Sequence, residues 1–65
     1  MKILFSDFRA AGVCRNARTT FFVPHGLNWR DFLKNGIEEN VLRSFGDQLD
    51  RIDKLAAAAR AREAL

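Results

Sequence analysis

The sequence contains one cysteine, one proline and no tyrosine among its 65 residues. With Cys14 alone, no disulfide can form within the chain. A chain this short buries only about 60% of the surface that it exposes when unfolded, and its core alone supplies little more than about 3–5 kcal/mol. We therefore expect either very good helix packing or burial against a partner, in a reducing compartment.

Long apolar runs are missing too. No stretch approaches the roughly 20 apolar residues that span a bilayer, and the apolar start Met1–Phe5 is too short for a secretory signal. Hydrophobic residues make up 48% of the sequence, which favours a folded domain over disorder. We expect a protein made in the cytoplasm, with no membrane partner.

Residues that carry chemistry are scarce. Cys14 and His25 are the only soft metal ligands, whereas a zinc site needs three or four, so a metal would require ligands from another chain. A helix between them would hold them about 15 Å apart, too far for a nucleophile–base pair. We expect Cys14 to be a small buried side chain and His25 to flank the turn after Pro24. The sequence thus predicts a binding module with no catalytic residue, metal site or cofactor.

Helix signals divide the first half of the chain. Lys2–Phe5 is typical of a short strand or extended arm, and Ser6 is a good N-cap for a short helix that Gly12 ends. A second helix is expected over residues 14–23, because a proline at position 24 disfavours helical geometry in the residue before it.

The strongest local signal is the N-cap at Asn28, with Asp31 three residues later in a variant of the capping box. It predicts a short helix over residues 29–34, which Asn35 and Gly36 end. Such a short helix persists only if its apolar face is buried.

The second half repeats apolar residues at helical spacing, at Val41, Phe45, Leu49, Ile52, Ala56 and Ala59. Gly46 either ends one helix, with Asp47 capping the next, or lies inside one long helix; we favour the break. The ion pairs Asp47–Arg51 and Asp50–Lys54 are expected on its surface. The fold class is mainly α, with four or five short helices in one domain: an aromatic-rich head (1–46) and an amphipathic C-terminal helix (47–65).

Six phenylalanines and one tryptophan lie between Phe5 and Phe45, which is generous for a head of this size. We expect most of them in the core and one or two at an interface. The predicted protein-interface residues are Trp29, Phe32, Leu49 and Ile52. Self-association through residues 47–65 is a further hypothesis, with Leu49, Ile52, Ala56 and Ala59 as the contacts.

Basic residues are concentrated in the first half. Residues 1–36 hold six basic and two acidic side chains, and residues 37–65 hold five and six, for a net charge of +3. The outline of helix, turn and helix over residues 15–36 fits a helix-turn-helix, with Arg15 and Arg18 on the first helix and Arg30 and Lys34 on the second. Bulky Phe21 and Phe22 near the turn argue against it, and a basic surface is often merely solvated.

Two stretches, AAGVCRNARTTFF (10–22) and HGLNWRDFLKNGI (25–37), followed later by Gly46-Asp47, resemble a group of small proteins of tailed bacteriophages and prophages. The shared pattern is a cysteine, an arginine with an aromatic pair, and a His-Gly-Leu-Asn-Trp turn that opens a helix ending at Gly-Ile. The resemblance covers about residues 4–47 and implies a phage context but no activity. Pro24 departs from the pattern.

We therefore expect a non-catalytic bacteriophage module that binds a larger phage or host protein, as a small structural or assembly component of the tail or connector region. The alternative is a helix-turn-helix nucleic-acid-binding or accessory regulatory protein. Either would act in the host cytoplasm, and the first would also enter the virion.

Overall fold

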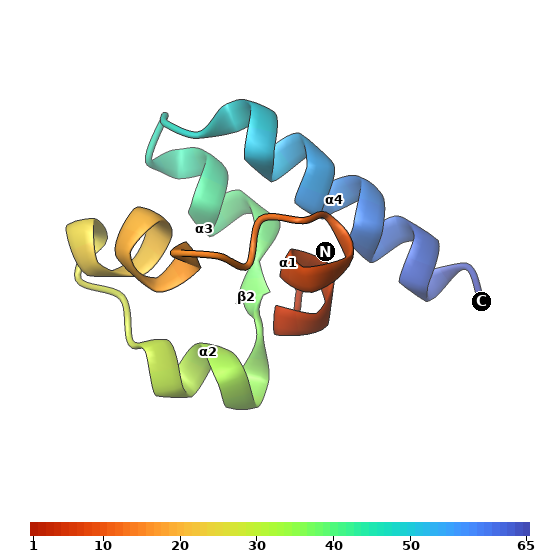
Figure 1. Cartoon of the computed structure of the whole chain (residues 1–65), viewed down its shortest axis with the longest axis horizontal. Helices are drawn as coiled ribbons and strands as arrows, with labels where there is room; N and C mark the ends of the chain where they lie inside the picture. Colours follow the sequence, from red (N-terminus) through yellow and green to blue (C-terminus); the bar gives the residue numbers. More distant parts are fainter.

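A computed structural model describes all residues 1–65 and shows a mainly α fold, as predicted (Figure 1). Four α-helices form it: α1 (Phe5–Ala10), α2 (Trp29–Asn35), α3 (Glu39–Ser44) and the much longer α4 (Leu49–Glu63). In Figure 1, α2 and α4 lie on opposite sides of the molecule, with α1 between them. No helix is long and apolar enough to cross a membrane.

Two short strands tie the start of the chain to its middle. β1 (Lys2–Ile3) pairs antiparallel with β2 (Ile37–Glu38), so that Ile3 faces Ile37. The expected N-terminal strand is therefore present. The partner strand β2 begins directly after Gly36, which caps the end of α2 and has a φ of 76°.

The segment between α1 and α2 differs from the single α-helix expected over residues 14–23. A turn at its start leads into a π-helical turn, η1 (Arg18–Phe22), and then a 3-10 turn, η2 (Val23–His25). Successive side chains of an α-helix point about 100° apart, whereas the wider π turn brings them closer together in direction. Phe21 and Phe22 both enter the core. Pro24 lies within η2 and does not end the helical path; left-handed Gly26 does.

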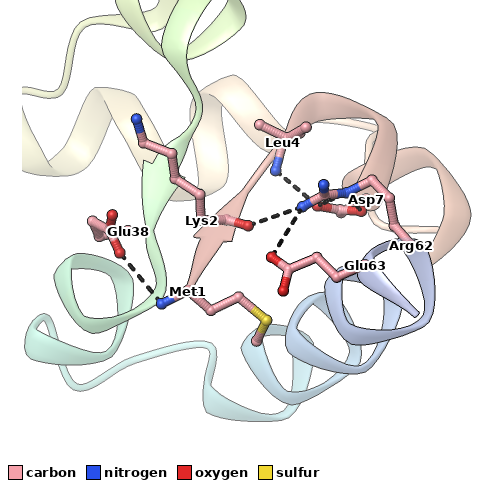
Figure 2. A network of polar contacts seen from close by, with 7 residues as sticks. All are labelled: Met1, Lys2, Leu4, Asp7, Glu38, Arg62 and Glu63. Carbon is pink, nitrogen blue, oxygen red and sulfur yellow. Dashed lines mark hydrogen bonds and ion pairs between the residues drawn. The ribbon is translucent and has the colours of Figure 1, made fainter. Parts of the chain in front are cut away.

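Helix α1 begins at Phe5, two residues earlier than an N-cap at Ser6 predicts. Leu4 is the N-cap residue, and the Leu4 backbone N–H donates to the Asp7 carboxylate at 2.8 Å. The same carboxylate, only 2% exposed, accepts hydrogen bonds from Arg62 of α4 (Figure 2). A polar network thus fixes the start of the chain against the last helix.

The core lies between α1, η1, α2 and α4. Phe8 contacts Phe21, Phe22 and Phe32 at ring-centroid distances of 5.2–6.2 Å. Helix α4 adds four buried residues at helical spacing: Ile52, Leu55, Ala56 and Ala59. It is therefore an integral part of the core, and a chain cut at Gly46 would lose a third of its buried residues.

The break at Gly46 is present, but not with the cap that the sequence indicated. Gly46 has a φ of 76°. The N-cap residue of α4 is Gln48, in the left-handed conformation, rather than Asp47. Asp47 instead lies 3.5 Å from the Nε2 atom of His25. Neither expected ion pair on α4, Asp47–Arg51 or Asp50–Lys54, is formed.

Candidate functional site

The aromatic side chains are covered within the chain itself. Phe8, Phe21, Phe22 and Phe32 are buried, and the remaining three are partly buried; none is exposed. Trp29 packs edge-on against Phe5 and Phe22, with ring centroids 5.8 and 5.1 Å apart. Most of the aromatic side chains therefore lie in the core as expected, and Phe5, Trp29 and Phe45 keep part of their surface exposed.

The four predicted interface residues divide into two groups. Phe32 and Ile52 are core residues, 3% and 1% exposed, so they are not offered to a partner. Trp29 is half-buried, while Leu49 is 47% exposed at the start of α4. The self-association hypothesis loses most of its contacts, because Ile52, Ala56 and Ala59 are all buried. Among large apolar side chains, the exposed ones are instead Val23, Leu33, Val41, Leu49 and Leu65.

A mostly apolar groove lies between α1 and the second half of α4. Its volume is about 510 Å³, and alanines from both helices line it: Ala10, Ala58 and Ala61. Ser6, the Asp7–Arg62 pair and the exposed Leu65 complete its lining. This groove was not predicted from the sequence, because it forms only where α1 packs beside α4 in the tertiary structure.

The Asp7–Arg62 pair holds the two walls of this groove together. Arg62 Nε lies 3.0 Å from the Asp7 carboxylate, and its Nη2 donates to the Lys2 carbonyl at 3.1 Å (Figure 2). The hydrogen bond to Asp7 raises the pKa of the Arg62 guanidinium above its ordinary value. The arginine therefore stays charged wherever the protein is folded.

Cys14 differs from the expectation, whereas His25 flanks the turn after Pro24 as expected. Cys14 is exposed, not buried. The His25 ring stacks on Phe45 at a centroid distance of 3.9 Å and an interplanar angle of 3°, which joins η2 to the end of α3. His25 Nε2 makes no hydrogen bond. No three His, Cys, Asp or Glu side chains are placed to hold a metal ion.

The residues predicted to contact nucleic acid are all exposed, but no hollow is lined by more than one of them. Arg15 and Arg18 lie in the segment before and at the start of η1, and Arg30 and Lys34 lie on α2. The unit that would be the first helix of a helix-turn-helix is a π turn followed by a 3-10 turn, and α2 has seven residues.

A different basic cluster is present. Arg15 lines a hollow of about 460 Å³ together with Arg51 and Lys54 of α4. Arg51 and Lys54 were not predicted as site residues, because their i,i+4 spacing to acidic residues suggested helix-surface ion pairs. Only the position of the segment after α1 against α4 brings the three cations together.

No protein family, curated protein or solved structure matches this chain. The resemblance to phage proteins therefore stays a prediction. What supports a function is the set of surfaces described above: the apolar groove, the basic hollow and the exposed aliphatic side chains.

Proposed function

We propose that this chain is a non-catalytic binding module of a tailed bacteriophage or prophage, and that it docks onto a larger protein during assembly of the particle. The groove between α1 and α4 is the observation that carries the proposal. Its about 510 Å³ falls within the range of ordinary binding pockets, and its walls are mostly apolar.

The groove suits an apolar helix of a larger partner. Alanine walls leave little side chain between the backbones, so a partner's helix can approach closely and insert its larger apolar side chains. Arg62 and Asp7 are already paired with each other, so the lining offers little free charge. Burial of apolar area at about 25 cal/mol per Å² would supply the main attraction.

Placing a charge in the groove tests the proposal. Ala61→Glu puts a carboxylate on its wall, whereas Ala57→Glu, its matched control, adds the same group to an exposed position of α4 outside the groove. We expect the wild-type chain and Ala57→Glu to co-sediment with nuclease-treated particles or assembly intermediates from host cells. Ala61→Glu should remain in the soluble fraction, because an unpaired carboxylate is expensive to bury.

Circular dichroism melting of all three proteins shows whether they share one fold. The proposal fails if the wild-type chain never sediments with particles or intermediates. It fails equally if a folded Ala61→Glu variant sediments as the wild type does, because the groove would then play no part.

A further inference from the structure

The hollow that contains Arg15 differs from the other hollows of the surface in its charge. It lies between the segment that follows α1 and the first half of α4. Three cationic side chains and no acidic one are among its lining residues: Gly12, Val13, Arg15, Asn16, Thr20, Arg51 and Lys54.

None of the three cations has a carboxylate partner within 4.0 Å. Two other arginines are paired, Arg43 with Glu39 and Asp53 and Arg62 with Asp7, so what distinguishes the hollow is that three unpaired cations line it together. Asp53, next to Lys54 in the sequence, pairs with Arg43 instead. Asp50, next to Arg51, lines a neighbouring hollow with Arg51 and forms no ion pair with Lys54. Like charges that converge without counter-charges attract anions.

Neutral donors complete the hollow. The Asn16 amide and the Thr20 hydroxyl make no hydrogen bond within the chain, so both remain free to donate to an anion. No atom lies within 4 Å of where a Cβ on Gly12 would be, which leaves the rim open. Cations together with amide and hydroxyl donors are the groups that bind phosphate oxygens in nucleic-acid complexes.

We propose that Arg15, Arg51 and Lys54 bind the phosphate backbone of duplex nucleic acid. Exposed side chains gain little from one isolated anion in water, so useful affinity requires several phosphates at once, which a polymer supplies. No aromatic ring lines the hollow, so bases cannot stack there and the binding is independent of sequence. This site is separate from the α1–α4 groove and does not depend on its role.

Anisotropy of a fluorescein-labelled 20-base-pair duplex with the purified full chain tests the proposal. If three phosphates are neutralised, a fourfold rise in salt weakens binding about 40-fold. The double variant Arg51→Gln/Lys54→Gln should reduce the slope of log affinity against log salt by about 2. The matched control is Arg30→Gln/Lys34→Gln, which removes the same charge from exposed positions on α2 and should leave the slope unchanged.

A second readout reports on the site itself. Cys14, the only thiol, is exposed and precedes Arg15 in the chain. Bound duplex should slow its alkylation by iodoacetamide in the wild type and in the α2 control, but not in the α4 double variant. Asp50→Asn keeps all three cations and removes the acid next to Arg51, which shares a neighbouring hollow with it, so it should tighten duplex binding even if the double variant folds poorly.

Three results would overturn the proposal. The first is the absence of duplex binding at 25 mM salt. This result counts against the proposal even if inorganic phosphate alone slows the alkylation of Cys14. The second is a reduced slope of log affinity against log salt in Arg30→Gln/Lys34→Gln but not in Arg51→Gln/Lys54→Gln. That result would favour contact through a helix-turn-helix. The third is unchanged affinity in both double variants.

Discussion

At the scale of single residues, Gly36 is the position with the least freedom to change. Its φ of 76° and ψ of −173° lie in a region that residues with a side chain rarely occupy. A Cβ there would lie 2.6 Å from Leu4 Cδ2 and 3.0 Å from the Ile3 carbonyl oxygen. The tight passage from α2 into β2, against β1, therefore requires a glycine.

Replacing Gly36 with alanine should lower the free energy of unfolding by at least about 2 kcal/mol, because backbone strain and steric overlap act together. Gly26→Ala is the control: it has a similar φ of 66° but open space around it, and should cost only about 1 kcal/mol. Urea unfolding followed by Trp29 fluorescence measures both. Equal losses would show that the contact with β1 contributes nothing.

At the scale of elements, α4 carries two leucines in opposite environments. Leu55 is fully buried, whereas Leu49 is 47% exposed at the first residue of the helix. The same substitution at both positions therefore separates burial from helix propensity, because alanine favours helix at either site.

We expect Leu55→Ala to destabilise the protein by about 2–5 kcal/mol, through lost apolar contact and the cavity that it leaves. Leu49→Ala should change stability by no more than about 0.5 kcal/mol. Thermal melting by circular dichroism gives both values. A comparable loss at the two positions would mean that α4 does not pack on the core as described.

The elements that the sequence predicted are those whose signals are local. Asn28 caps α2, and its side chain accepts from the Asp31 N–H at 2.9 Å. Gly46 separates α3 from α4 as expected, and the helical spacing of apolar residues predicts the buried face of α4. The start of α1 was not predicted, because the Asp7 carboxylate that accepts from the Leu4 N–H is held in place by Arg62, 55 residues away. The basic hollow was missed for the same reason: Arg51 meets Arg15 only in the tertiary structure.

At the scale of the whole molecule, the Asp7–Arg62 pair joins elements from the two ends of the described chain. Asp7 is nearly inaccessible to water, so its charge depends on Arg62 and on the Leu4 N–H for compensation. Breaking a buried pair from one side leaves an unpaired charge, which is worse than removing both partners.

Arg62→Met should therefore destabilise the protein more than Arg60→Met, an exposed neighbour without an ion pair. In the double variant with Asp7→Asn, the loss should be smaller than the sum of the single losses. The folded-state pKa of Arg62 is raised, so its contribution is complete below the ordinary guanidinium range and is lost only as pH rises above it. Urea unfolding should give the same coupling free energy between Arg62 and Asp7 at pH 6 and at pH 9. If the losses of the two single variants simply add in the double variant, the two side chains do not stabilise the fold as a pair.

The contact of Arg62 with the Lys2 carbonyl and with Asp7 also bears on how the protein is made. On the ribosome, β1 and α1 emerge before α4, and the Arg62 that pairs with Asp7 is translated 55 residues later. Until α4 has left the exit tunnel, Phe8 and its aromatic neighbours lack the helix that covers them. The nascent chain should therefore stay open to chaperones and proteases until α4 has emerged, and fold in a single event only then.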